Sequence, residues 1–294
     1  MIEGVAAVAA ALEAHDYLAD EGLATSIHLA LELGRPLFLE GEAGVGKTEV
    51  AKVLARWRGT ELIRLQCYEG IDATQALYEW DYARQLLHLR AAEAAGGPVE
   101  EDELYSPRFL VRRPLLQAID HAGPPPVLLI DEIDRADDEF EAFLLELLAD
   151  FSVTIPELGV VRAEAPPIVV LTSNRTRDVH DALKRRCLYH WIDHPDFDRE
   201  VAVVERKAEG VDRALARQVA GAVEAMRTLD LYKPPGVAET IDWAAALARL
   251  GVTRLDDRVV RATLGVVLKY REDQARVEAD DLITVLAAAG ARGG

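Results

Sequence analysis

Several features are scarce in this sequence. Its 294 residues include two cysteines, Cys67 and Cys187, which lie far apart in the chain. So few cysteines argue against a disulfide framework and are typical of free thiols in a reducing compartment. No apolar run approaches the roughly 18 residues of a membrane-spanning helix, and the first residues lack the basic segment that begins a signal peptide. We therefore expect a cytoplasmic protein with no membrane span.

Basic residues are also scarce. The chain has 33 Lys and Arg against 51 Asp and Glu, a formal net charge of −18. Proteins that grip nucleic acid usually carry a basic stripe, because neutralising phosphates supplies much of the affinity. Only a small basic cluster is present, at Arg108, Arg112 and Arg113. This balance disfavours DNA motors and clamp loaders, and we expect no nucleic-acid partner.

One octapeptide carries the clearest chemical signal. It matches the pattern G-x-x-x-x-G-K-[ST], follows an apolar run at 37–39 and leads into a helical stretch at 49–55, as a phosphate-binding loop requires. Two of its glycines let successive N–H groups point at one anion, and the helix adds its positive end. The lysine would reach the β- and γ-phosphates and the threonine would offer a hydroxyl to Mg²⁺. The sequence therefore predicts binding of ATP with Mg²⁺ by Gly41, Glu42, Ala43, Gly44, Val45, Gly46, Lys47 and Thr48.

Polar residues end two other apolar runs. The run at 127–130 ends in Asp131 and Glu132, at the strand end where ligands bind in α/β sheets. We expect Asp131 to hold Mg²⁺ through water and Glu132 to orient and deprotonate the attacking water. An Asp-Glu pair can also simply begin a helix. Asn174, after the run at 168–172, would hydrogen-bond the γ-phosphate or the water, or else only form a turn.

The chain also shows its organisation. Apolar runs at 37–39, 62–66, 127–130, 168–172 and 189–192 alternate with helical stretches, which predicts a parallel sheet covered on both faces. We expect an exposed loop at 96–105. We predict an α/β nucleotide-binding domain at 1–195, with an insert at about 70–110 and a β-hairpin at about 152–165. A second domain, at 196–294, should contain about four helices.

Two smaller groups have alternative interpretations. Cys187, His190 and His194 offer metal-ligand atoms, but they span an expected strand and the loop after it, so we expect them to diverge. The aromatic side chains at 78, 80 and 82 alternate. They would form either a partner-binding face or part of the packing of the insert.

Together these motifs resemble those of AAA+ ATPases over nearly the whole chain. The extended insert, the hairpin and the approach to the octapeptide at 34–41 resemble the MoxR branch. Two short stretches, 77–86 and 183–187, are similar to the CoxD-like subgroup. That subgroup is associated with the maturation of molybdenum-containing enzymes of the carbon monoxide dehydrogenase type.

The resemblance implies a P-loop NTPase fold, with five parallel strands in the order 5-1-4-3-2 and a smaller helical lid. It also implies a homo-oligomeric ring, usually a hexamer, with ATP at the subunit interfaces. Arg185 and Arg186 occupy the arginine-finger position, where a guanidinium neutralises the transition state of a neighbour's γ-phosphate. Arg186 aligns best; alternatively both arginines are simply solvated. Gln66 would restrain the catalytic Glu or only end its strand.

One departure concerns the lid. Relatives often place an arginine near the start of the third lid helix, whereas residues 234–243 contain acids and no arginine. Contact between nucleotide and lid would then run through Lys233 or Arg199.

The leading hypothesis is an ATP-hydrolysing chaperone of MoxR type that remodels or helps metallate a client metalloenzyme, such as a molybdenum hydroxylase, with a von Willebrand A-domain adaptor. The alternatives are a nucleotide-gated binding module with incidental hydrolysis, or a nucleic-acid motor, which the net charge opposes.

Overall fold

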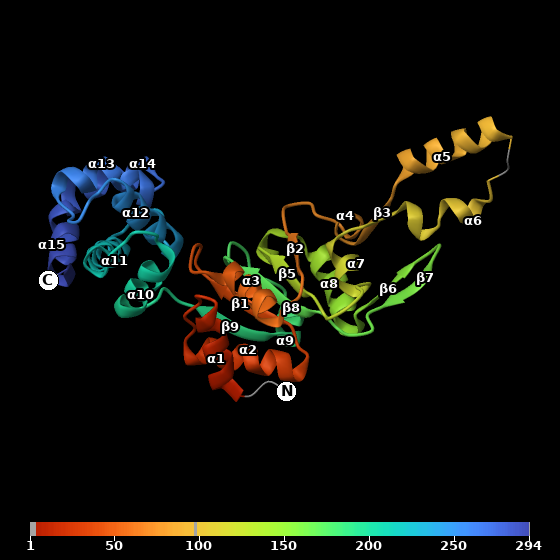
Figure 1. Ribbon diagram of the computed structural model, residues 1–294, viewed down its shortest axis with the longest axis horizontal. Helices are drawn as coiled ribbons and strands as arrows, with labels where there is room; N and C mark the ends of the chain where they lie inside the picture. Colours follow the sequence, from red (N-terminus) through yellow and green to blue (C-terminus); the bar gives the residue numbers. More distant parts are fainter. Residues whose placement is uncertain (1–3, 97–98, 294) are drawn as a thin grey trace. The chain divides into compact units, whose positions relative to one another are not determined.

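A computed structural model describes residues 4–96 and 99–293. The first unit of the chain is built on a five-stranded sheet in the order β2-β5-β8-β1-β9 (Figure 1). Numbered along the chain, these strands follow the order 5-1-4-3-2 from the other edge, as predicted. β2 pairs with β5, β5 with β8 and β8 with β1, all in parallel. The strands are β1 (Leu37–Gly41), β2 (Leu62–Gln66), β5 (Val127–Asp131), β8 (Ile168–Ser173) and β9 (Leu188–Ile192).

Burial on both faces explains why the runs of the central strands β1, β5 and β8 form strands. Every residue of β5 is buried, which is typical of a central strand in a parallel sheet. Leu128 and Ile130 on one face share a core with Leu116 and Leu144 from two helices, and the alternate residues of β5 are buried as well. The helices around the sheet are α1 (Gly4–Ala14), α2 (Glu21–Leu33), α3 (Lys47–Arg58), α7 (Pro114–Ile119), α8 (Asp138–Asp150) and α9 (Asp181–Arg186), with the short turn η2 (Ile133–Arg135).

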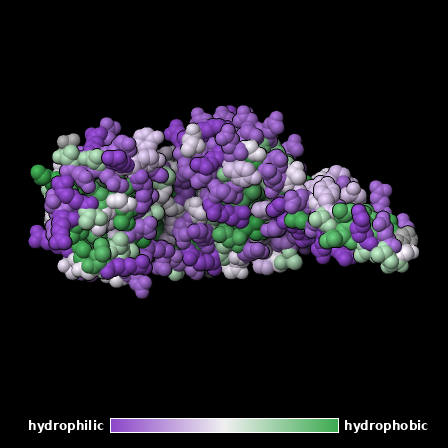
Figure 2. Space-filling model, turned by 90° about the horizontal axis from the view of Figure 1, so that it is seen from above, coloured by the Kyte–Doolittle hydropathy of each residue, from purple (hydrophilic) through white to green (hydrophobic). Residues whose placement is uncertain are grey.

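The insert between β2 and α7 forms a small layer of its own. Trp80 is 7% exposed and packs edge-on against Tyr105 and Tyr78. Tyr82 begins a helix and is 69% exposed, and Leu86 and Leu87 in the same helix are 54% and 71% exposed. Figure 2 shows apolar side chains on the surface of this insert. The insert consists of α4 (Ala73–Leu77), β3 (Tyr78–Trp80), α5 (Tyr82–Ala95), α6 (Glu101–Leu104), η1 (Pro107–Phe109) and β4 (Leu110–Arg112).

The structure corrects one expectation in the insert and confirms another beyond it. The segment predicted as a loop at 96–105 contains the helix α6; residues 97–98 lie outside the described part. Three acidic residues in the first turn of α6 stabilise its positive end. The predicted hairpin is present, with β6 (Ser152–Ile155) antiparallel to β7 (Gly159–Arg162).

The C-terminal part is helical throughout its described residues. Asp196, Asp212 and Asp256 each accept a hydrogen bond from a backbone N–H in the first turn of the helix that follows, the usual N-cap arrangement. Trp243 is fully buried and donates to the Thr263 hydroxyl at 2.8 Å. The expected number of about four helices was too low, because α13 and α14 are separated at residues 268–270, where the sequence has no Gly or Pro signal. The elements are α10 (Phe197–Lys207), α11 (Arg213–Arg227), α12 (Val237–Arg249), α13 (Asp257–Val267), α14 (Arg271–Arg276), the π-turn η3 (Val277–Asp281) and α15 (Leu282–Gly293).

The chain divides into two compact units. The first comprises Glu21–Glu40 and Thr48–Trp191 together with the N-terminal residues up to Val8. The second comprises Ala9–Asp20, Gly41–Lys47 and the chain from Ile192 onward. Two N-terminal segments thus group with the helical part, so these units differ from the domains predicted at 1–195 and 196–294, and that division stays a prediction. None of the described helices has both the length and the apolar character needed to cross a bilayer.

Candidate functional site

The octapeptide forms the connection between β1 and α3, which we call the glycine-rich loop (residues 41–48). β1 ends at Gly41 and α3 begins at Lys47. Gly44 and Gly46 have φ of 84° and 96°, a region in which a side chain would be strained. The loop therefore has the strand–loop–helix setting that the sequence predicts, with glycine at the two positions where the backbone reverses.

The lysine of the loop is held inside it. Lys47 is 6% exposed, and its Nζ donates to the carbonyl oxygens of Gly41 at 2.7 Å and Glu42 at 2.6 Å. The ammonium group therefore lies within the curl of the loop.

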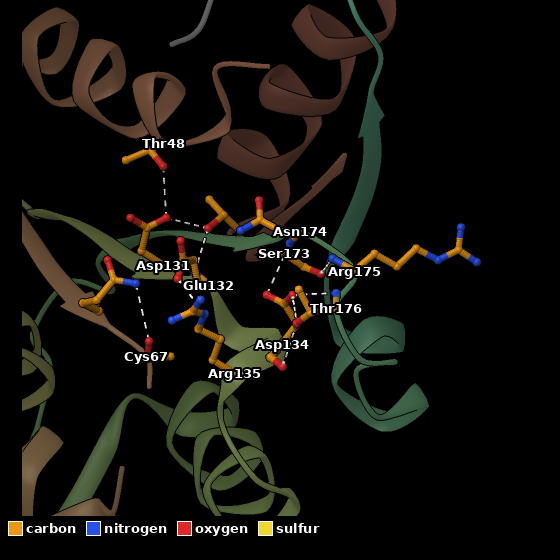
Figure 3. Close-up of polar contacts among 12 residues, drawn as sticks. Thr48, Cys67, Asp131, Glu132, Asp134, Arg135, Ser173, Asn174, Arg175 and Thr176 are labelled. Carbon is orange, nitrogen blue, oxygen red and sulfur yellow. Dashed lines mark hydrogen bonds and ion pairs between the residues drawn. The ribbon is translucent and has the colours of Figure 1, made fainter. Parts of the chain in front are cut away.

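Asp131, the last residue of β5, is the most highly hydrogen-bonded carboxylate of the site (Figure 3). It is 2% exposed. Its Oδ1 accepts from the hydroxyls of Thr48 at 3.0 Å and Thr172 at 2.6 Å, and its Oδ2 accepts from Nε of Arg64 at 2.9 Å. The hydroxyl of Thr48 and this carboxylate are hard oxygen donors of the kind that Mg²⁺ prefers, so the residues fit the predicted metal.

Glu132 follows with an unusual backbone. Its φ of 56° and ψ of 51° lie in the left-handed region, which is uncommon for a residue with a side chain and recurs at functional sites. Its N–H donates to the Thr172 hydroxyl at 2.9 Å, and its Oε2 pairs with Nε of Arg135 at 3.1 Å. Gln66 instead accepts from Arg64. Among the described residues, the side chain of Glu132 thus pairs with Arg135, and the contacts of Gln66 fit the alternative in which it only ends its strand.

A buried carboxylate also holds the turn that contains Asn174. Asp134 is 3% exposed. It accepts from the N–H of Asn174 at 3.2 Å and from the N–H and hydroxyl of Thr176 at 2.8 Å and 2.7 Å. The side-chain amide of Asn174 forms no hydrogen bond with any residue that the structure describes. The turn is therefore fixed through its backbone, and the amide remains available to a ligand.

A second buried carboxylate supports the same turn. Glu40 is 3% exposed and accepts from the hydroxyls of Ser173 at 3.1 Å and Tyr189 at 2.9 Å. Burial and the hydrogen bond to Glu40 raise the pKa of Tyr189 to about 12, so this hydroxyl stays a donor. Ser173 in turn accepts from the N–H of Arg175, whose φ is 58°. The ends of β1 and β8 are thereby joined next to the glycine-rich loop and Asn174.

Both candidate finger arginines lie at the end of α9. The side chain of Arg35 donates to the carbonyl oxygens of Arg185, Arg186 and Cys187, which places a cation at the negative end of this short helix. The guanidinium of Arg186 donates to the carbonyl of Leu145 at 3.1 Å. The side chain of Arg185 is exposed and has no hydrogen-bond partner in the described part of the chain.

The glycine-rich loop also contacts the start of α12, within the second unit. The N–H groups of Val237 and Ala238 donate to the carbonyl of Gly44 at 3.1 Å and 3.4 Å. A Cβ built on Gly236 would lie 2.9 Å from both the Ala43 carbonyl oxygen and the Gly44 Cα. Only a glycine therefore fits at this contact.

Buried polar groups fix the approach to α12. Arg227 forms a two-pronged ion pair with Glu200 and donates to the Pro235 carbonyl at 2.8 Å. Thr240 donates to Glu200 at 2.8 Å. Arg199 pairs with Asp20 and the N–H of Lys233 donates to Asp273; contact of either side chain with nucleotide stays a prediction. The backbone at the start of α12 contacts the glycine-rich loop.

The sequence did not reveal several of these residues. Arg64, Arg135, Asp134 and Glu40 gave no motif signal, although Arg64 shares its strand face with Gln66. The metal alternative at Cys187, His190 and His194 gains no support, because the described residues contain no cluster of three His, Cys, Asp or Glu side chains able to hold a metal. Burial raises the pKa of Cys187 to about 12, so its thiol is inert near neutral pH.

Comparisons with known proteins agree with this geometry. The sequence profile of the AAA domain (dynein-related subfamily) matches residues 36–187, more than half of the chain. Denitrification regulatory protein NirQ of Stutzerimonas stutzeri is 23% identical over 233 residues, 76% of each chain. Uncharacterized protein SH1500 of Staphylococcus haemolyticus is 24% identical over 274 residues, 90% of this chain and 96% of its own.

Solved structures share the fold. Two variants of RuvB of Thermotoga maritima superpose with TM-scores of 0.50 and 0.51, each at 16% sequence identity. They cover 98% and 92% of this chain, and 83% and 80% of their own. At this identity the likeness concerns the fold alone.

Proposed function

Because the chain belongs to the AAA domain family (dynein-related subfamily), we propose that it is a Mg²⁺-dependent ATPase with its site at the glycine-rich loop. One observation carries this proposal. Thr48, the last residue of the loop, donates to Asp131 at 3.0 Å. The hydroxyl and carboxylate expected to bind the metal are therefore already in contact, although 83 positions separate them.

The residues divide the work as follows. The N–H groups of the loop and Lys47 would bind the β- and γ-phosphates. Thr48 and, through water, Asp131 would hold Mg²⁺, which would neutralise phosphate charge. Glu132 would accept a proton from the attacking water. The side-chain amide of Asn174 would donate to the γ-phosphate or to the water, from a turn that Asp134 fixes. Phosphoryl transfer depends mainly on such positioning and charge stabilisation.

Steady-state phosphate release tests this activity. We expect the purified chain to hydrolyse ATP when Mg²⁺ is present and not when EDTA removes it. Lys47→Ala protein prepared in the same way gives the background rate. Release no faster than this background would contradict the ATPase assignment and would favour a nucleotide-gated binding module.

At a finer level we propose a MoxR-type chaperone that assembles into a ring, for which a hexamer is the expected size. The motif resemblance supports the branch, and the exposed Arg185 beside Arg186 is consistent with an arginine that reaches a neighbouring subunit. NirQ is by its name a regulator of denitrification, which is compatible with action on another protein. Cytoplasmic location remains part of the proposal.

The proposed partners are a von Willebrand A-domain adaptor and a client metalloenzyme, for which a molybdenum hydroxylase fits the similarity at 77–86 and 183–187. The exposed Tyr82 and Leu86 lie in the first of these stretches, and the exposed Leu87 directly follows it. We expect the adaptor encoded nearest this chain's gene to raise the ATPase rate, and a molybdenum hydroxylase operon beside it. No stimulation by that adaptor, together with an unrelated gene neighbourhood, would contradict the chaperone proposal.

A further inference from the structure

Arg64 on β2 contacts Asp131, the predicted metal ligand at the end of the neighbouring strand β5. β2 and β5 pair in parallel with Arg64 opposite Leu129 and Gln66 opposite Asp131. Because alternate residues of a strand share a face, Arg64 and Gln66 point the same way. The Arg64 guanidinium contacts Asp131 Oδ2 through Nε at 2.9 Å and Nη2 at 2.5 Å, and it also donates to Gln66.

The two partners differ sharply in burial. The side chain of Asp131 is 4% exposed, whereas that of Arg64 is 52% exposed. A buried carboxylate without a counter-charge is costly, and the hydroxyls of Thr48 and Thr172 supply hydrogen bonds but no charge. Arg135 pairs with Glu132 instead. Arg64 therefore places a positive charge directly on Asp131.

We propose that Arg64 is a charge substitute for the metal: it neutralises Asp131 until Mg²⁺ and nucleotide bind, and then it leaves the carboxylate. The inference rests on the proposed ATPase function. Two cations beside one carboxylate repel each other, and Arg64 contacts Oδ2, whereas the hydroxyls of Thr48 and Thr172 both donate to Oδ1. A half-exposed guanidinium loses little on returning to water. Arg64 therefore sets the concentration of metal that the site requires.

Metal binding by an Arg64 variant tests this inference. In Arg64→Met the side chain keeps its length and apolar stem but loses its charge. The matched control is Arg112→Met, because Arg112 is 45% exposed and pairs at 2.8 Å with the exposed Asp120, away from the site. Mn²⁺ is titrated into protein with equimolar ADP, and free Mn²⁺ is read by electron paramagnetic resonance. We expect the Mn²⁺ concentration at half-saturation to be lower by about 5-fold or more in Arg64→Met and unchanged in the control.

Thermal unfolding supplies a second readout. Without metal or nucleotide, Arg64→Met should melt below the wild type, because Asp131 has lost its counter-charge. Saturating Mn²⁺ and ADP should reduce this difference in melting temperature. Without them, Arg64→Lys should melt at a temperature between those of Arg64→Met and the wild type. An unchanged Mn²⁺ midpoint would overturn the inference. Weaker ADP binding at saturating Mn²⁺ would also overturn it, because Arg64 would then be a phosphate ligand.

The two proposals fail differently. If the wild type binds Mn²⁺ and ADP but Arg64→Met has the same midpoint, only the role of Arg64 is rejected. If the wild type binds no ADP, the ATPase proposal is rejected, and the displacement of Arg64 by metal is rejected with it.

Discussion

The backbone N–H of Val237 donates to the carbonyl oxygen of Gly44 at 3.1 Å, so the first residue of α12 contacts the turn of the glycine-rich loop. A helix N-terminus carries a partial positive charge. Here it contacts the carbonyl of Gly44, which is part of the glycine-rich loop. Glu239 caps this helix by accepting from Gly236 N–H at 3.0 Å. Loop and helix start are thereby joined without the arginine that relatives use.

Gly236→Ala tests this contact. The new Cβ would lie 2.9 Å from Ala43 O and Gly44 Cα, so the backbone must shift and α12 should separate from the loop. We expect ADP affinity to fall by about 5-fold or more in calorimetry. The control is Gly265→Ala in α13, where the nearest atom to a Cβ is 3.8 Å away. Equal affinities in the two variants would show that the contact does not support nucleotide binding.

Lys47→Ala should abolish ATP binding. The variant removes the cation whose Nζ lies within the curl of the loop, 2.7 Å from the Gly41 carbonyl, so the phosphate charge would lack its partner. Calorimetry measures the affinity, and Lys52→Ala on the same helix, which removes an exposed lysine paired with Glu49, is the control. Micromolar affinity in Lys47→Ala would reject the phosphate-loop assignment.

Glu132→Gln should separate binding from turnover. Glutamine keeps the shape of the side chain but cannot accept the proton of water, so we expect unchanged ATP affinity and a turnover lower by about 10²–10⁴. Phosphate release gives the rate, with Glu139→Gln at an exposed position of α8 as control. A rate near that of the wild type would mean that another group positions the water.

Arg186→Ala should leave ATP binding intact while hydrolysis falls by up to about 10³–10⁵, as for arginines that act in trans. For this role its guanidinium must leave the Leu145 carbonyl, which it contacts at 3.1 Å. Arg185→Ala is the matched variant, and its exposed side chain requires no such release. If only Arg185→Ala loses hydrolysis, the finger is Arg185.

Mixing subunits distinguishes a finger in trans from a residue acting within its own subunit. Arg186→Ala protein keeps an intact glycine-rich loop, and Lys47→Ala protein keeps an intact Arg186. Mixed rings should regain activity where the two intact elements face each other. If mixed rings form, as shown by pull-down of differently tagged subunits, and no activity returns, Arg186 acts within its own subunit.

Local patterns in the sequence were sufficient to predict the strands, the glycine-rich loop and the polar residues at the strand ends. These features depend on neighbours in the chain: apolar runs form the buried strands β1, β5 and β8, and Gly44 and Gly46 provide the positive φ values that the loop needs. Even the strand order followed from the family resemblance. Local patterns failed at α6, where three acids in a polar stretch begin a helix that we read as a loop.

The tertiary structure alone decided which side chains meet. Arg64 reaches Asp131 across 67 positions because β2 lies beside β5 in parallel register, and Asp134 holds the turn at Asn174 across 40 positions. The approach of Val237 to Gly44 depends on the buried Arg227–Glu200 pair. Such contacts carry no periodic signal, because each depends on strand register and on the packing of distant helices. The sequence by itself therefore predicts where the phosphate chemistry lies, and the folded chain determines which charges surround it.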